Sequence, residues 1–235
     1  MYAVLFDIDG TLIQTGGAGQ LGFARAFADQ FGVAKLSGEV SFAGRSDRAI
    51  ALDLMRAHDV PQTDENWQRF QEAYLGNLPA ALAELPGTVL PGIPAFIAAL
   101  QQRSDVAIGL LTGNLRRGAE AKLTHYELWD HFPFGGFGDL ATDRNEIAAT
   151  ALAAANDHAA ACNGRSGPLR EAMVIGDTVH DVRCGKSIGA YTVAVPTGQT
   201  SAETLSAEAP DVLLDDLSDC TPLLERIGAV LGTAR

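Results

Sequence analysis

The amino-acid sequence predicts an α/β protein, with a doubly wound, Rossmann-like parallel sheet as its core and an inserted all-helical cap domain. Two observations indicate the core. Short apolar runs alternate with helical patterns, as parallel strands and their right-handed crossovers do, and each run ends in small or polar residues. A third observation indicates the insertion, because residues 16–87 contain helical patterns and no convincing strand. We therefore expect a core of residues 1–15 and 88–235 and a cap of residues 16–87.

The first strand of the core is predicted at residues 2–6. This apolar run is too short for a helix before Gly10 and is typical of a buried strand in a parallel sheet. Runs of the same character predict further strands at residues 106–111, 172–175, 191–195 and 211–214. The helical patterns between these runs cover residues 93–102, 116–125, 146–156 and 181–188.

The inserted segment is expected to contain four helical stretches, at residues 22–31, 47–58, 66–75 and 79–85. Glycines at positions 16, 17 and 19 mark its start, and Pro-Gly pairs at 86–87 and 91–92 mark the return to the core. Glycine and proline interrupt regular structure. We therefore expect the chain to hinge at these two places.

Composition limits the classes of function. The chain of 235 residues is 47% apolar, enough for a hydrophobic core, and its net charge of −12 argues against binding to nucleic acid. Three cysteines, Cys162, Cys184 and Cys220, are far apart and indicate neither a disulfide framework nor a zinc site. No segment has the length of a membrane span or the pattern of a signal peptide. We expect a cytoplasmic monomer or homodimer that binds a small molecule.

Carboxylates at the ends of two predicted strands are the strongest functional signal. Asp7 and Asp9 follow the first strand, and Asp177 and Asp181 follow the strand at 172–175. Ligands of open α/β sheets bind at this carboxyl edge. One carboxylate there can bind a hard cation and attack phosphorus, while another protonates the leaving oxygen and later activates water. So much negative charge requires a cation, and Mg²⁺ is the natural one.

Two further sets of residues are suited to holding a phosphoryl group. Thr112, Gly113 and Asn114 follow the strand at 106–111, where a hydroxyl, an amide and backbone N–H groups near a helix start can bind phosphate oxygens. Arg144 precedes the helical pattern at 146–156 and can neutralise the equatorial oxygens. An alternative is that Arg144 forms a surface ion pair with Asp143 or Glu146.

These motifs together resemble those of the haloacid dehalogenase superfamily: DxDGTL, TGN, a basic residue before a later helix, and GDTxxD, in the family's order. The insertion resembles the helical cap of phosphoglycolate-phosphatase-like members. The resemblance implies that Asp7 is the nucleophile, Asp9 the general acid and base, and Thr112 with Asn114 the phosphate holder. It implies that Asp7, the backbone carbonyl of Asp9 and Asp177 bind Mg²⁺, with Asp181 orienting its water shell. Arg144 stands where the family more commonly has lysine.

A loop in the inserted segment, residues 42–47, has two interpretations. Ser46 or Asp47 can cap the helix that begins after it, which is a structural role. Related caps present a similar Gly-Arg-Thr-Asp-like segment toward the core, which implies that Arg45 and Ser46 face the substrate. Arg45 would then meet an anionic group of that substrate.

The sequence thus predicts a Mg²⁺-dependent phosphatase acting on a small phosphorylated metabolite through an aspartyl-phosphate. Asp9 argues against a dehalogenase, and a phosphonatase would need a cap lysine, for which only Lys35 is available. A sugar phosphomutase of the same fold and a catalytically idle binding or regulatory module remain alternatives. His180, between Asp177 and Asp181, is expected to be a neighbour without chemistry, because Asp9 already serves as the base.

Overall fold

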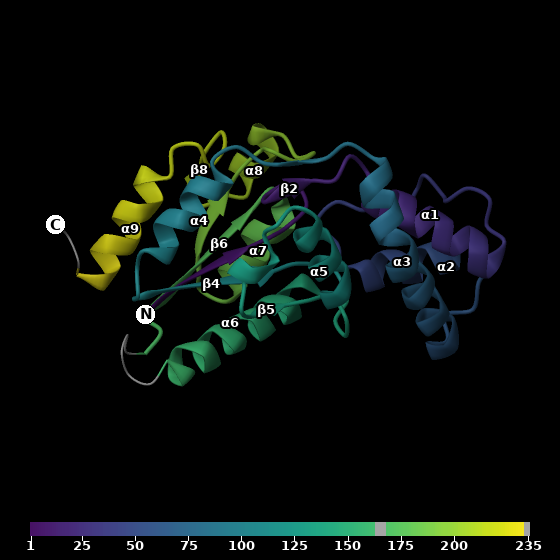
Figure 1. Cartoon of the computed structure of the whole chain (residues 1–235), viewed down its shortest axis with the longest axis horizontal. Coiled ribbons are helices and arrows are strands. Elements are labelled where there is room, and N and C mark those ends of the chain that lie inside the picture. Colours follow the sequence, from purple (N-terminus) through teal and green to yellow (C-terminus); the bar gives the residue numbers. More distant parts are fainter. Residues whose placement is uncertain (163–167, 233–235) are drawn as a thin grey trace.

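Six parallel strands form the central sheet, in the order β5-β4-β1-β6-β7-β8 (Figure 1). The structure, a computed structural model, describes residues 1–162 and 168–232. The central position of β1, between β4 and β6, brings the residues that follow these three strands to one edge. The strands are β1 (Tyr2–Phe6), β4 (Val106–Leu111), β5 (Gly135–Gly136), β6 (Glu171–Gly176), β7 (Tyr191–Ala194) and β8 (Val212–Leu213).

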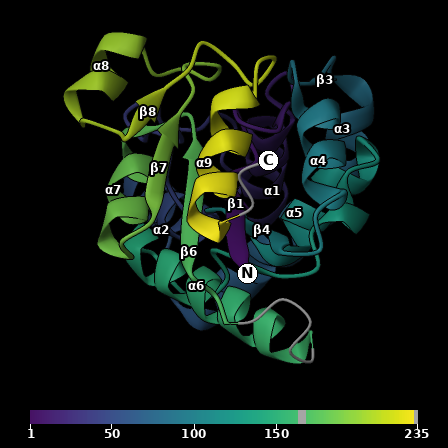
Figure 2. The same cartoon turned by 90° about the vertical axis from the view of Figure 1, so that its left-hand side faces the viewer.

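Helices cover both faces of the sheet, as the alternation of elements predicts (Figure 2). The side chains of β1 alternate between two hydrophobic clusters: Tyr2, Val4 and Phe6 join one, and Ala3 and Leu5 join the other. The first cluster includes α4 (Ile93–Gln101), α5 (Arg116–His125) and α9 (Thr221–Leu231); the second includes α6 (Arg144–Ala161) and α7 (Val179–Ser187). The short α8 (Ala202–Ala207) contributes Leu205 to a small cluster beside β8.

Three helices of the inserted segment pack together at the end of the molecule opposite the N-terminus (Figure 1). These are α1 (Ala18–Phe31), α2 (Asp47–Ala57) and α3 (Asp64–Glu84). They share a separate hydrophobic cluster in which Phe23, Phe70 and Tyr74 contact one another through their rings. Leu115, next to α5, also belongs to this cluster. The inserted helices therefore have a core of their own that also contacts the sheet domain.

A short antiparallel ribbon lies where the chain leaves the sheet domain and where it returns. Its strands are β2 (Ile13–Gln14) and β3 (Thr88–Val89). Gly16 follows with a φ of 61°, and a Cβ there would stand 2.1 Å from the carbonyl oxygen of Pro86. Glycine is needed at this position both for its backbone conformation and for the close approach of the returning chain.

The structure confirms the α/β class and differs from the expected elements in several details, among them the ribbon of β2 and β3 and the helices α8 and α9, which were not predicted. One helix, α3, replaces the two predicted at 66–75 and 79–85, with Pro79 inside it. Proline removes one backbone hydrogen bond, but buried residues continue at helical spacing through Tyr74, Leu78 and Leu82, and their packing keeps the helix intact. The strand β5 was not predicted, because its two glycines have little strand propensity. No helix within residues 1–162 and 168–232 is both long and apolar enough to cross a membrane.

Candidate active site

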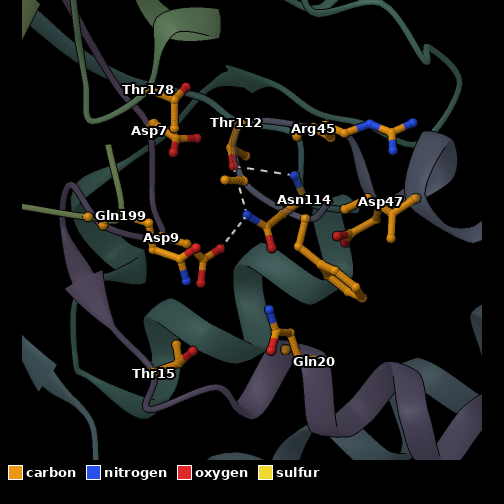
Figure 3. A pocket seen from close by; sticks show the side chains of 18 of the residues that line it. Asp7, Asp9, Thr15, Gln20, Arg45, Asp47, Thr112, Asn114, Thr178 and Gln199 are labelled. Atoms are coloured by element: carbon orange, nitrogen blue, oxygen red, sulfur yellow. Dashed lines mark hydrogen bonds between the residues drawn. The ribbon is translucent and has the colours of Figure 1, made fainter. Parts of the chain in front are cut away.

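A cavity of about 440 Å³ lies between the carboxyl edge of the sheet and the inserted helices. Its walls bring together side chains from both parts of the chain (Figure 3). Asp7 and Thr112 lie on one side in this view, and Thr15 and Gln20 face them from the other. The sheet domain contributes Asp7, Asp9, Thr112, Asn114, Arg144 and Asp177. The inserted helices and their loops contribute Gln20, Phe23, Phe42, Arg45, Asp47 and Tyr74.

Asp7 is held at the end of β1, where its backbone N–H donates to the carbonyl of Ile175 at 3.0 Å. The residue is only 7% exposed, although it lines the cavity. Burial and the neighbouring carboxylate of Asp181 raise the pKa of Asp7 to about 7, against the lowering effect of Arg144. Asp7 thus borders the cavity, and a positive charge close to it would stabilise its ionised form.

Asp177 lies in a tight backbone cradle. A Cβ at Gly10 would stand 2.5 Å from its Oδ2, and one at Gly198 would stand 1.7 Å from the same atom. Burial, followed by the charges of Asp181 and Asp7, raises the pKa of Asp177 to about 9. Two glycines therefore make room for a carboxylate whose ionised form lacks sufficient neutralisation from the protein.

A hard divalent cation fits this group of oxygens. One carboxylate oxygen from each of Asp7, Asp177 and Asp181 lies within 4.8 Å of the others, and all three residues are buried. No hydrogen bond from the described residues reaches the carbonyl oxygen of Asp9, which leaves it available as a ligand. Carboxylate and carbonyl oxygens suit Mg²⁺ and similar hard ions. Burial and neighbouring carboxylates raise the pKa values of both Asp7 and Asp177. A bound cation would supply the positive charge that their ionised forms lack.

Asp181 combines a structural role with a place in the site. Its Oδ2 accepts hydrogen bonds from the backbone N–H and the hydroxyl of Thr178, at 3.0 and 2.6 Å, in the capping box of α7. Its Oδ1 pairs with the guanidinium of Arg144. These bonds hold both oxygens of Asp181 in place within the site, and its role in orienting the water shell of a metal stays a prediction.

Arg144 is the first residue of α6 and is 6% exposed. Its Nη1 lies 3.6 Å from Oδ1 of Asp7, while Nη2 pairs with Asp181. Burial alone would lower the pKa of Arg144, but the two carboxylates outweigh it and keep the guanidinium charged. Its Nε is buried without a hydrogen-bond partner among the described residues. The surface ion pair with Asp143 or Glu146 is therefore not what forms.

Thr112, Gly113 and Asn114 form a turn after β4 with donors left unused. The hydroxyl oxygen of Thr112 accepts from the side chain of Asn114 at 2.8 Å, and within residues 1–162 and 168–232 nothing accepts its hydrogen. The backbone N–H of Gly113 likewise has no acceptor there. Both donors border the cavity beside Asp7. They are suited to oxygens of a bound phosphoryl group.

Asp9 lies on the side of Asp7 that faces Thr15 and Gln20 (Figure 3), and two side chains donate hydrogen bonds to it. Its Oδ2 accepts from Nδ2 of Asn114 at 2.9 Å and from Nζ of Lys122 at 2.6 Å. The ammonium of Lys122 also donates to Oδ1 of Asn114 at 2.6 Å. Lys122 lies outside the motifs by which the sequence predicts the site. Its signal was a lysine among Gly118, Ala119 and Leu123 on the buried face of α5.

The loop before α2 is packed firmly on the sheet domain. The backbone N–H of Asp47 donates to the carbonyl of Gly113 at 2.8 Å, and its carboxylate accepts from the N–H of Leu115 at 2.9 Å. Ser46 is buried and caps α2 through the N–H of Ala49. Burial raises the pKa of Asp47 to about 6. The capping interpretation of Ser46 accounts for its position, and Asp47 is a contact that the sequence did not indicate.

Arg45 lines the cavity, but its guanidinium is engaged elsewhere. It pairs with Asp53 at 2.5 Å and donates to the carbonyl of Ser41 at 3.3 Å. Figure 3 shows the side chain extending away from Asp7 and Asp9. His180 is half-buried and lies outside the main cavity lining, and burial lowers its pKa. Neither residue contacts the carboxylates of the site through an ion pair or hydrogen bond in the described residues.

Removing the divalent cation should make stability depend on pH through Asp177. Because folding raises the pKa of Asp177 from 3.8 to about 9, its favourable contribution is complete below the lower value and is lost as pH rises through the upper one. In EDTA, Asp177→Asn should therefore melt at a higher temperature than the parent at alkaline pH, with a difference that shrinks toward acid pH. Saturating Mg²⁺ should reverse the order, because it binds the parent better.

The measurement is thermal unfolding by circular dichroism across this pH range. Asp157→Asn, on the exposed face of α6, makes the same chemical change away from the cavity and should leave the pH profile unchanged. A difference between Asp177→Asn and the parent that is constant from acid to alkaline pH would contradict the argument.

The chain is similar to known proteins over most of its length. A family model described as haloacid dehalogenase-like hydrolase matches residues 4–186. A protein of Synechococcus elongatus named phosphoglycolate phosphatase is 27% identical over 219 residues, covering 93% of this chain and 95% of that protein. A hydrolase of Pseudomonas syringae has a TM-score of 0.71 at 20% identity, with 97% and 99% of the two chains covered. CbbY of Rhodobacter sphaeroides, solved in complex with phosphate, has a TM-score of 0.69 at 20% identity, with 93% and 96% covered.

Proposed function

The chain belongs to the haloacid dehalogenase-like hydrolase family, and we propose that it is a Mg²⁺-dependent phosphatase that hydrolyses a small phosphate monoester through a phosphoryl group carried on Asp7. The observation that carries this proposal is the position of Asp7. Its buried carboxylate borders an open cavity, with the guanidinium of Arg144 at 3.6 Å and unused donors of Thr112 and Gly113 beside it. This is what a nucleophile for phosphoryl transfer requires.

The metal supports the same chemistry. Members of this family generally use a divalent metal, and the buried cluster of Asp7, Asp177 and Asp181 offers oxygen ligands for one. We propose Mg²⁺, held by Asp7, Asp177 and the carbonyl of Asp9. When bound, it neutralises charge on the phosphoryl oxygens.

The first step is transfer of the phosphoryl group. A carboxylate oxygen of Asp7 forms a bond to phosphorus as the ester P–O bond breaks, and Asp9 donates its proton to the leaving oxygen. Arg144 and the donors of Thr112 and Gly113 stabilise negative charge on the three equatorial oxygens. The alcohol leaves, and the phosphoryl group stays on Asp7.

The second step is hydrolysis of the acyl phosphate. Asp9, now a carboxylate, takes a proton from water, whose oxygen bonds to phosphorus while the bond from phosphorus to Asp7 breaks. Inorganic phosphate forms, Asp7 is restored as a carboxylate, and Asp9 is protonated for the next cycle. The proton that Asp9 gives in the first step is thus returned in the second.

The inserted segment, residues 16–87, serves as a cap in this proposal. The contacts of Asp47 with Gly113 and Leu115 hold its loop against the sheet domain over the cavity. Such closure excludes water during transfer and selects the leaving group. A volume of about 440 Å³ suits a small metabolite rather than a macromolecule.

Other chemistries of the same fold are less well supported. A phosphonatase needs a neutral lysine amine, yet Lys35 is exposed and outside the cavity lining of the described residues. Burial alone would lower the pKa of Lys122, but Asp9 and Asp47 outweigh it and raise the pKa above its usual value, so this amine stays charged. A dehalogenase has no need of Asp9 as acid and base. A sugar phosphomutase shares Asp7 and Asp9 and is the remaining enzymatic rival.

A panel of phosphate monoesters, assayed with Mg²⁺ and with EDTA, tests the proposal. We expect release of inorganic phosphate with Mg²⁺ and its loss in EDTA, restored by added Mg²⁺. Isomerised sugar phosphate without net phosphate release would indicate the phosphomutase. No turnover of any ester by folded protein with Mg²⁺ would favour an idle binding module.

A further inference from the structure

We propose that Lys122 is a positioning residue that holds the carboxylate of Asp9 for its two proton transfers. This inference rests on the proposed function, because it concerns the acid and base of that reaction. It assigns a reaction-related role to a lysine of α5, outside the four sequence motifs that predicted the site.

The geometry fixes one oxygen of Asp9 and leaves the other available. Nζ of Lys122 at 2.6 Å and Nδ2 of Asn114 at 2.9 Å both donate to Oδ2 of Asp9. Lys122 also orients Asn114, through the bond to its Oδ1 at 2.6 Å. No donor in residues 1–162 and 168–232 reaches Oδ1 of Asp9, which is the atom left to exchange a proton with substrate or water. Figure 3 shows Asn114 bridging Thr112 and Asp9.

Asp9 needs such a restraint more than the other carboxylates do. Its side chain is 40% exposed, whereas those of Asp7 and Asp181 are 9% and 1% exposed. An exposed side chain of this kind samples several rotamers, and a general acid must lie within hydrogen-bond reach of the atom that it protonates. The paired donors limit Asp9 to an orientation beside the cavity.

The other cations of the cavity are committed elsewhere. Arg144 contacts Asp7 and Asp181, and Arg45 pairs with Asp53. Among the described basic residues that line the cavity, only Lys122 forms an ion pair with Asp9. A role in holding Asp9 therefore belongs to this residue.

Burying the charged ammonium of Lys122 costs folding free energy, which a purely structural role would not require. This residue is 3% exposed, in the apolar stripe of α5, and its ammonium lies 3.4 Å from where a Cβ on Gly19 of α1 would stand. Replacing both partners of a buried ion pair with apolar side chains is often neutral or even stabilising, and Asp9, whose side chain is 40% exposed, would remain solvated if Lys122 alone were replaced, so stability alone does not explain a lysine here. A methionine of similar length would fill the same space. Activity and stability should therefore respond differently to its removal.

The test compares two aryl esters of similar size, phenyl phosphate and p-nitrophenyl phosphate, in the full-length enzyme with saturating Mg²⁺. Phenolate is the poorer leaving group and depends more on protonation by Asp9. Lys122→Met should lower kcat/KM for phenyl phosphate by about tenfold to a hundredfold, part of what general acid catalysis contributes. The loss for p-nitrophenyl phosphate should be several-fold smaller, with KM for both esters within about threefold of the parent.

Variants of the same site separate positioning from packing. Lys122→Arg should recover part of the loss, because it restores a cation, and Lys122→Gln should lie between Arg and Met. Lys186→Met, on the exposed side of α7, makes the matched change away from the cavity and should leave both esters unaffected. In an Asp9→Asn background, Lys122→Met should cause no further loss, because there is no acid left to position.

Three results would overturn the inference: equal losses for both esters, a full additional loss in the Asp9→Asn background, or activity of folded Lys122→Met within about twofold of the parent. If Lys122→Met does not fold, the same comparison in Lys122→Gln decides. Near-parent activity of Asp9→Asn alone would instead overturn the proposed mechanism. The two failures are therefore distinguishable.

Discussion

Replacing Asp7 with Asn should reduce kcat/KM by roughly four orders of magnitude or more while the fold is retained. Removal of a nucleophile from an enzyme that forms a covalent intermediate has effects of this size. Asn has nearly the same shape but a far weaker nucleophile, and it removes a ligand of the proposed metal. Because folding raises the pKa of Asp7 to about 7, its ionised form is unfavourable in the metal-free fold, and the neutral amide should not lower thermal stability in EDTA.

The measurement is steady-state turnover of the best ester from the panel, together with thermal unfolding. Asp157→Asn provides the matched control, since it makes the same change on the exposed face of α6. Turnover by Asp7→Asn within tenfold of the parent would rule out nucleophilic attack by this residue.

Replacing Arg144 with Ala should lower kcat/KM by roughly a hundredfold or more, as removal of one preorganised charge-stabilising donor does. Its guanidinium lies between Asp7 and Asp181 in a buried wall of the cavity, which places a fixed positive charge beside the carboxylate that would carry the phosphoryl group. Arg144→Lys should recover part of the loss, because the charge returns without the planar fork of donors. A surface ion pair would contribute at most about 1 kcal/mol to stability and almost nothing to rate.

Stability must be separated from rate in this experiment. Arg144→Ala leaves Asp181 buried without its cation, which is destabilising by about 3–5 kcal/mol in comparable cases. Assays should therefore be made well below the melting temperature of the variant. Arg226→Ala breaks a partly buried pair with Glu171, away from the cavity lining, and controls for the loss of an ion pair. If Arg144→Ala turns over substrate within a few-fold of the parent, another cation must neutralise the phosphoryl group.

The sequence predicted the sheet and its carboxyl edge because both depend on local patterns. An apolar run bounded by turn residues marks each long strand, and the polar residues after a strand necessarily reach the edge where the strand ends. For this reason the sequence alone predicts that Asp7, Asp177 and Thr112 lie close together. The contact between Arg144 and Asp7 depends on where α6 begins relative to the sheet. The sequence therefore predicted a role for Arg144 but not this contact.

Features that arise from packing between distant elements could not be predicted in this way. Lys122 contacts Asp9 because the buried face of α5 packs against the cavity. No local sequence pattern predicts this packing. Arg45, before α2, is paired with Asp53 eight residues later within that helix, so its charge is compensated within the inserted segment. Helix α3 continues through Pro79 because buried contacts on both sides outweigh the missing hydrogen bond.

The central claim, transfer of a phosphoryl group to Asp7, is tested most directly by quenching the enzyme with acid during turnover and mapping its peptides by mass spectrometry. Trypsin leaves the N-terminal segment as one peptide ending at Arg25, the first basic residue of the chain. The account predicts that this peptide gains the mass of one phosphoryl group, located at Asp7 by fragmentation, and that the gain is absent in Asp7→Asn. A phosphoryl group on any other residue, or continued turnover by Asp7→Asn without one, would contradict it.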